Sequence, residues 1–293
     1  MPIAACWIPT PSISMTCPMP DLPRSFSPSS AGVWKQCPRR WRYRYVERLP
    51  DPPGIPALIG TFAHRVLELL CDEPAADRTV DRARELAGRA WPETAINPDF
   101  VALGLDDRQV HDFRWKAWTA IEGLWALEDP AGVEVRATEC RVTATVGGVP
   151  FYGIVDRLDG DGDGLVITDY KSGKAPRSAD RPKSLDQVLL YAAAVEDSMG
   201  ERPDRARLLY LGAEILETAV SEDLLADTTG RFAKSWDEVG AACSGDHFET
   251  RPGPLCGWCP YVDRCDDGRA EVKRRVGAGR MREDAPARAL LGL

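Results

Sequence analysis

Hydrophobic positions recur along this chain at two spacings, and the spacing changes near Pro130. Before that point apolar residues return every three or four positions, which is the period of a helix with one buried face. Directly after it, apolar and polar residues alternate in runs separated by glycine and aspartate, which is typical of half-buried strands. The pattern predicts helices over residues 58–71, 78–90, 107–127, 183–198 and 222–243, a short helix ending near Trp34, and strands over 133–146, 149–158, 164–170 and 205–212.

The order of these elements predicts an α/β fold in which helices accompany a sheet. With 293 residues the chain is long for an average domain, but it fits one enlarged domain. We expect a disordered leader at 1–24, a single domain at 25–268 with a helical insertion at about 72–130, and a flexible polar tail at 269–293.

Composition narrows the compartment and the class of partner. The first residues lack the basic region of a signal peptide, and no run of about 18 apolar residues occurs, so we expect a cytoplasmic protein without a membrane partner. The net charge of −8 argues weakly against nucleic acid as a partner, but a sum over the chain conceals local patches. Nine cysteines without a secretory signal indicate metal or redox chemistry rather than a disulfide scaffold.

Two acids and a lysine lie near the ends of adjacent predicted strands. Asp169 and Lys171 are two residues apart, so their side chains point to the same side of one strand. Asp156 lies near the end of the preceding strand, and a hairpin joins that strand to the Asp169 strand. The two carboxylates can therefore converge, and two converging carboxylates make a site for a hard cation. Judged alone, Asp-x-Lys is more often a surface ion pair, and Asp156 and Asp159 are equally interpretable as ordinary acids at a hairpin end.

Further polar positions lie on the neighbouring elements. His64 is roughly opposite the aliphatic face of its helix, and its imidazole can bind Mg²⁺ or Mn²⁺, with Mn²⁺ favoured. Gln187 and Tyr191 are four residues apart on one helix face, where they could contact a substrate or simply cover the sheet. Glu139, on the first strand, is a further candidate acid for which an ordinary surface role is favoured.

Together these segments resemble the RecB-type branch of the PD-(D/E)XK nuclease superfamily. In the family's order they are GTFAHRVLELL around His64, GIVDRLD around Asp156, ITDYKSGK around Asp169 and Lys171, and QVLLYAAAV around Gln187. The resemblance implies a PD-(D/E)XK restriction-endonuclease-like core with a central mixed sheet flanked by helices. It implies metal ligands at His64, Asp156, Asp169 and the backbone carbonyl of Tyr170, a catalytic lysine at Lys171, and a supporting helix motif at Gln187 and Tyr191.

The same resemblance implies metal-dependent hydrolysis of phosphodiester bonds at DNA ends, with single-stranded DNA preferred. One or two Mg²⁺ or Mn²⁺ ions would bind the scissile phosphate and activate a water, while Lys171 would orient that nucleophile and offset charge. The roles that follow are recombination or repair, and end trimming in CRISPR spacer acquisition, in a complex with a protein partner. The alternative is a catalytically silent DNA-end-binding subunit of a nuclease/helicase complex, and the intact set of site residues speaks against it.

Three cysteines crowd into one short C-terminal segment. Cys256, Cys259 and Cys265 offer soft ligands that suit Zn²⁺ or an iron–sulfur cluster. A closed site needs a fourth ligand, and Cys37 is the best candidate. One upstream cysteine followed by this triplet resembles the CRISPR-associated iron–sulfur exonucleases and the AddB-like nucleases, which implies a 4Fe–4S cluster on the loop 256–265. Spacing alone leaves zinc at the same four cysteines open.

A basic stretch with interleaved aromatic residues runs from Lys35 to Arg48. Its arginines could neutralise phosphates, and its rings could stack on unpaired bases. The alternative is an amphipathic surface segment whose rings pack inward, and we expect both to hold in part. The stretch also speaks against a third hypothesis, a zinc-stabilised interaction protein without DNA contact. The DNA-binding residues predicted here are Arg39, Arg40, Trp41, Arg42, Tyr43 and Arg44.

Overall fold

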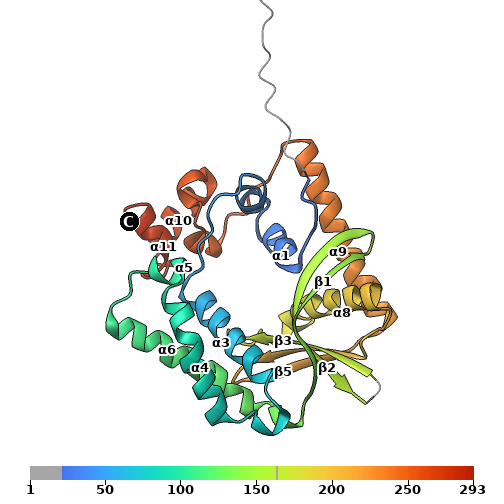
Figure 1. The fold of residues 1–293 in the computed structure, drawn as a ribbon. Coiled ribbons are helices and arrows are strands. Elements are labelled where there is room, and N and C mark those ends of the chain that lie inside the picture. The colour runs from blue at the N-terminus through green and yellow to red at the C-terminus, as the bar shows by residue number, and fades with distance from the viewer. Residues whose placement is uncertain (1–21, 163) are drawn as a thin grey trace, which may run out of the picture.

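A five-stranded mixed sheet forms the centre of the molecule (Figure 1). The structure, a computed structural model, describes residues 22–162 and 164–293, so the leader predicted at 1–24 lies outside the described residues except for its last three. The strands lie in chain order across the sheet, and β3 and β4 are its parallel pair. They are β1 (Glu134–Val146), β2 (Val149–Asp161), β3 (Gly164–Lys171), β4 (Arg205–Tyr210) and β5 (Glu214–Ala219).

The first three strands form an antiparallel meander, which includes the hairpin predicted between the Asp156 and Asp169 strands. β1 and β2 meet at a turn through Gly147 and Gly148, whose φ angles of 58° and 80° are open to glycine without steric strain. β3 pairs with β2, and the chain then crosses over through α8 (Asp186–Met199) to the parallel neighbour β4. The mixed sheet flanked by helices that the resemblance implies is thereby confirmed.

The far edge of the sheet differs from the prediction. One strand is predicted over 205–212, whereas the structure ends β4 at Tyr210 and starts a short partner, β5, after a turn in which Gly212 has a φ of 75°. β5 pairs with β4 alone and has a single buried residue, Leu216. A short edge strand with one buried position leaves too little alternation for the sequence pattern to detect.

Helices cover both faces of the sheet and build two hydrophobic clusters. The α-helices are α1 (Pro28–Gln36), α2 (Pro38–Trp41), α3 (Ile55–Cys71), α4 (Val80–Ala95), α5 (Pro98–Val101), α6 (Asp107–Glu122), α7 (Arg181–Ser184), α8, α9 (Glu222–Ser244), α10 (Asp266–Gly277) and α11 (Pro286–Leu290). On one face α8, α9 and α1 pack over the strands, with Trp34, Val155 and Phe232 in the same cluster. On the other face α3 joins α4 and α6, and this cluster includes Tyr170 of β3 and Leu209 of β4.

The segment predicted as a helical insertion contains α4, α5 and α6. Asp106 caps α6 and forms a capping box with Gln109, which satisfies N–H groups that a helix start leaves unpaired. α6 and α4 both pack on α3, so this helical unit supports the helix that carries His64. Within the described part of the chain, no helix combines the length and apolar character needed to cross a membrane.

The C-terminal residues contradict the flexible tail predicted at 269–293. They form most of α10 and all of α11, which pack over the cysteine segment (Figure 1). Val272 and Ala287 are fully buried in a third small cluster with Val262. The sequence pattern missed this unit because its few apolar residues are buried against a loop rather than against a long helix or strand.

Candidate active site and cysteine cavity

One side of the site is a chain of polar side chains between β3 and α8. The Lys171 ammonium lies 2.5 Å from Asp169 Oδ2 and donates to Gln187 Oε1 at 2.9 Å. Gln187 Nε2 in turn donates to Asp169 Oδ1 at 2.9 Å and lies 3.2 Å from the Tyr191 hydroxyl. The four residues that the sequence placed on a strand end and a helix face therefore meet, and Gln187 fixes the relative position of the lysine and the carboxylate.

The other side of the site joins β2, β3 and α3. Asp156 Oδ2 accepts the Tyr170 backbone N–H at 2.8 Å and lies 3.3 Å from His64 Nδ1. His64 Nε2 lies 3.0 Å from the Tyr170 carbonyl oxygen. The imidazole from the helix thus sits against the strand end, and the three groups proposed from the family pattern as oxygen and nitrogen ligands are neighbours in space.

Glu139 of β1 completes this group, although the sequence favoured an ordinary surface role for it. Ligand atoms of His64, Glu139 and Asp156 all lie within 4.8 Å of one another. Glu139 has a φ of 45°, which is unusual for a residue other than glycine. The strand pairs on either side of it, Thr138 with Arg157 and Cys140 with Val155, place it opposite Asp156. The available sequence signal was its position on the strand that pairs with the Asp156 strand.

Burial and like charge set the electrostatics of the site. Asp169 is only 2% exposed, and burial followed by the charge of Asp156 raises its pKa to about 6, against the opposing effect of Lys171. Burial and then Asp156 also raise the pKa of Glu139. Burial lowers the pKa of His64, but the hydrogen bond and charge of Asp156 outweigh that effect and raise it. Crowded carboxylates of this kind are stabilised by a bound cation.

The donor set fits a hard divalent cation. Asp169 Oδ2 is buried beside the Lys171 ammonium, and a carboxylate oxygen in such an ion pair keeps a second lone pair that can bind a cation. The remaining donors nearby are carboxylate oxygens, a backbone carbonyl oxygen and one imidazole nitrogen, which suit Mg²⁺ and Mn²⁺ better than thiophilic metals. The arrangement can therefore hold a divalent ion next to a lysine.

Behind the site lies a buried ion network that the sequence did not reveal. Arg157 is fully buried and contacts Glu128 at 2.6 Å and Asp159 at 2.7 Å. Its guanidinium also donates to the Tyr170 hydroxyl at 2.6 Å. Arg207 pairs with the same two acids from β4. Asp159 is therefore not an ordinary hairpin-end acid, and the network anchors β3 from the face opposite Asp169.

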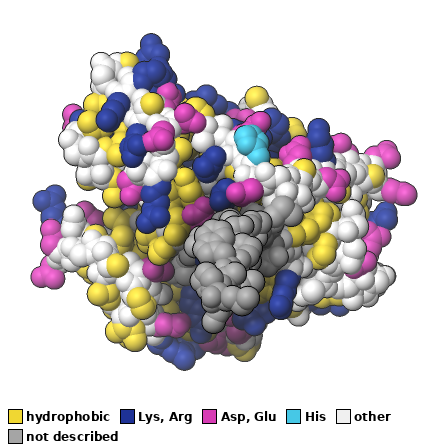
Figure 2. Space-filling model, turned by 90° about the horizontal axis from the view of Figure 1, so that it is seen from above, with side chains coloured by type: hydrophobic (Ala, Val, Ile, Leu, Met, Phe, Trp, Pro, Cys, Tyr) yellow, Lys and Arg dark blue, Asp and Glu magenta, His cyan; other side chains and the backbone are white. Residues whose placement is uncertain are grey.

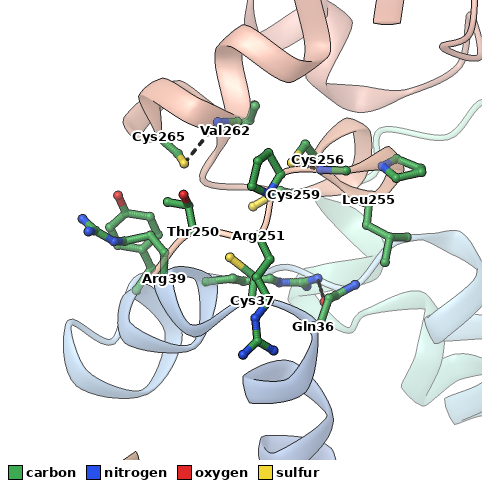
Figure 3. Close-up of a pocket in the computed structure, with 16 residues that line it drawn as sticks. Gln36, Cys37, Arg39, Thr250, Arg251, Leu255, Cys256, Cys259, Val262 and Cys265 are labelled. Atoms are coloured by element: carbon green, nitrogen blue, oxygen red, sulfur yellow. Dashed lines mark hydrogen bonds between the residues drawn. The ribbon is translucent and has the colours of Figure 1, made fainter. Parts of the chain in front are cut away.

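Four cysteines line a second site, a cavity of about 220 Å³. Figure 3 shows Cys37 on one side of it and Cys256, Cys259 and Cys265 on the other, C-terminal side. Burial raises the pKa of Cys259 to about 11 and also raises that of Cys256, so these thiols stay protonated until a metal displaces the protons.

The spread of the sulfur atoms bears on what this cavity can hold. A tetrahedral zinc ion with Zn–S bonds of about 2.3 Å holds its sulfurs about 3.8 Å apart. Among the described residues, His64, Glu139 and Asp156 are the one group of three whose candidate ligand atoms all lie within 4.8 Å of one another. No three cysteine sulfurs in the described chain do so. The thiols as placed therefore do not form the compact set of a closed tetrahedral zinc site.

The aromatic residues predicted to stack on DNA are instead part of the core. Trp41 is 0% exposed, its ring packs against those of Trp34 and Phe248, and its indole N–H donates to Ser30 Oγ at 2.9 Å. Tyr43 is also buried and donates its hydroxyl to the Arg264 carbonyl at 3.1 Å. Neither ring has a free face for a base, so their assignment as stacking residues is wrong.

Most arginines of the same stretch are paired with acids within the protein. Arg40 and Arg44 both pair with Asp51, and Arg42 pairs with Glu47 and with Asp246 from far along the chain. Arg39 donates through Nε to the Phe248 carbonyl at 3.0 Å. On the face seen in Figure 2, basic and acidic side chains are likewise interspersed. Three of the four predicted DNA-binding arginines are thus paired with acids, and two of these acids, Asp51 and Asp246, lie outside Lys35–Arg48.

Comparison with known proteins finds a family whose model covers the residues of this site. A family model described as the PD-(D/E)XK nuclease superfamily matches residues 25–266, a span that contains the site on the sheet and all four cavity cysteines. One subunit of the ATP-dependent helicase/nuclease of Desulforamulus reducens is 27% identical over 175 residues. That match covers 57% of this chain and 12% of the relative, so the chain spans a small part of the relative's length.

Proposed function

This chain belongs to the PD-(D/E)XK nuclease superfamily, and from that premise we propose that it is a divalent-metal-dependent exonuclease that hydrolyses phosphodiester bonds at DNA ends, with a preference for single strands. The observation that carries the proposal is the convergence of Asp169, Lys171 and Gln187 beside the His64–Asp156 pair. A metal-binding set next to a positioned ammonium is the combination that phosphodiester hydrolysis requires.

We assign the metal site to His64, Asp156, Asp169 and the carbonyl oxygen of Tyr170. The contacts that support this assignment are those of His64 with Asp156 and with the Tyr170 carbonyl. Bound Mg²⁺ or Mn²⁺ supplies Lewis-acid polarisation of the phosphate and a bound water of lowered pKa. Glu139 adds a carboxylate within reach of His64 and Asp156, either as a ligand or through a bound water.

Lys171 is the residue that acts on the reacting groups. Its ammonium orients the attacking water and offsets the negative charge that develops on the phosphate. Asp169 and Gln187 hold that ammonium, and Tyr191 holds Gln187, so the lysine does not have to reorganise during the reaction. Gln187 and Tyr191 therefore act as positioning residues.

We further propose that Cys37, Cys256, Cys259 and Cys265 hold a 4Fe–4S cluster. The observation that supports this proposal is that all four cysteines line one cavity, and the resemblance of their spacing to iron–sulfur nucleases is the reason for preferring a cluster to zinc. Thiolate ligation would join α1 and α2 to the C-terminal segment, so metal binding would contribute to folding. The role of the group in this proposal is structural.

The exonuclease proposal is tested by comparing linear and closed circular single-stranded DNA. We expect the wild-type protein with Mg²⁺ or Mn²⁺ to release label from end-labelled linear strands and to leave circles intact. Equal cleavage of the circles would refute action at ends. Binding of ends without cleavage in either metal would favour the second candidate below.

The second candidate is a catalytically silent protein that binds DNA ends within a larger complex, and the match to a helicase/nuclease component of much greater length favours it. In either case we propose DNA as the substrate or ligand and a protein partner in a larger assembly, either for recombination or repair or for CRISPR spacer acquisition. A cytoplasmic location belongs to the same proposal.

A further inference from the structure

The connection between β3 and α8, residues 172–185, is a basic segment that neither the sequence motifs nor the proposed mechanism uses. It carries Lys174, Arg177, Arg181 and Lys183 against a single acid, Asp180. Arg181 forms an ion pair with Glu214 of β5. Three cations thus remain on one short connection that starts directly after Lys171.

These three cations lack acidic partners within the chain. In the part of the chain that the structure describes, no carboxylate oxygen lies within 4.0 Å of the side-chain nitrogens of Lys174, Arg177 or Lys183, and all three residues are exposed. This is the reverse of Arg42 and Arg44, which are paired. An exposed cation that is not paired within the protein can bind a phosphate without breaking an internal ion pair.

The connection is also fixed beside the site at both ends. It leaves β3 after Asp169 and Lys171 and returns into α8 just before Gln187, and these three residues contact one another. Its first residue, Ser172, lies against Gly60 on α3, where a Cβ would be 3.0 Å from the Ser172 hydroxyl oxygen. The two ends of the segment therefore lie beside the lysine, the glutamine helix and the histidine helix that the proposed mechanism uses.

We infer that the β3–α8 connection binds backbone phosphates of the DNA strand next to the scissile bond, through Lys174, Arg177 and Lys183. The inference rests on the proposed function for its substrate class, and it moves the main phosphate contact away from the stretch Lys35–Arg48. We assign the contact to the backbone because the three side chains are cationic and the segment has no aromatic residue that could stack on a base.

The salt dependence of binding tests this directly. The affinity of the full-length protein for a fluorescein-labelled oligothymidylate is measured by anisotropy in EDTA over a range of salt concentrations, so that no cleavage occurs. Each phosphate contact contributes about 0.7 to the slope of log K against log salt for single strands. We expect the triple variant Lys174→Gln/Arg177→Gln/Lys183→Gln, called the loop variant below, to reduce the magnitude of this negative slope by about 2 relative to wild type.

A matched control variant removes three positive charges at other positions on the surface. Lys234, Lys273 and Arg280 are exposed and likewise have no acidic partner within 4.0 Å in the described chain. The triple variant Lys234→Gln/Lys273→Gln/Arg280→Gln is expected to keep the wild-type slope. An equal fall in both variants, an unchanged slope in the loop variant, or a wild-type protein that does not bind the oligothymidylate overturns the inference.

The outcome is separable from that of the proposed function because binding is measured without metal. A wild-type protein that never cleaves DNA, but whose slope falls only in the loop variant, refutes the exonuclease and retains the phosphate site. A wild-type protein that cleaves, with a slope that does not depend on the loop, retains the exonuclease and refutes the site. Thermal melting of both triple variants verifies that each is folded.

Discussion

At the scale of single residues, Tyr170 belongs both to the site and to the core. Its N–H donates to Asp156 and its carbonyl oxygen faces His64, whereas its hydroxyl accepts from the buried Arg157. The motif residues could be found from the sequence because each is adjacent to a predictable strand or helix end. Glu128, which holds Arg157 from 29 residues away, could not be found, because no pattern connects two such distant positions.

Glu139 gives the residue-scale prediction. Glu139→Gln removes a carboxylate from the group with His64 and Asp156, so Mn²⁺ affinity measured by calorimetry is expected to fall about tenfold or more. Glu134→Gln, an exposed position on the same strand that pairs with Arg136, is the matched control and is expected to bind Mn²⁺ like wild type. Equal Mn²⁺ affinity in Glu139→Gln and wild type would exclude Glu139 from the metal site.

At the scale of elements, periodicity located most helices and strands but not which side of a segment faces inward. The basic stretch has the alternating aromatic and arginine pattern of a nucleic-acid surface, yet Trp41 is fully buried and Arg44 is paired with Asp51. Burial there is decided by Phe248 and other residues distant in sequence, which only the folded chain brings near. The same limit explains the missed strand β5 and the missed helix α11.

Gly123 gives the element-scale prediction, because it is where the helical unit touches the β4–β5 turn. Its carbonyl oxygen accepts the Gly212 N–H at 3.1 Å, and a Cβ added at Gly123 would lie 2.5 Å from the Gly212 nitrogen. Backbone cannot move aside as a side chain can, so Gly123→Ala is expected to lower the free energy of unfolding by about 1–3 kcal/mol in urea denaturation. Gly132→Ala, which meets nothing within 4 Å, is the control, and equal stability of the two variants would contradict the contact.

At the scale of the whole molecule, the four-cysteine cavity joins the beginning of the described chain to its end. Cys37 lies between α1 and α2, and its three partners lie in the segment before α10. Two further contacts run in parallel, from the Tyr43 hydroxyl to Arg264 and from the Tyr261 hydroxyl to Leu49. The cysteine spacing suggested this closure, but the ordered helices that surround it were not predictable from so few apolar residues.

The cavity gives the whole-molecule prediction. The proposed cluster predicts that the wild-type protein contains iron and absorbs visible light, and that Cys37→Ser and Cys256→Ser each lose both and melt at a lower temperature, since a bound metal group contributes to folding. Cys140→Ser, which changes a half-buried thiol outside the cavity, is expected to retain both. Stoichiometric zinc in place of iron in wild-type protein purified without air would contradict the cluster.

The measurement that tests the central claim most directly is the rate of label release from end-labelled single-stranded DNA by Lys171→Ala in Mg²⁺ or Mn²⁺. The account predicts a rate lower than wild type by roughly a hundredfold or more, because one transition-state donor is lost, with an unchanged melting temperature. Lys234→Ala, an exposed lysine on α9, is expected to cleave at the wild-type rate. Wild-type cleavage by a folded Lys171→Ala protein would contradict the account.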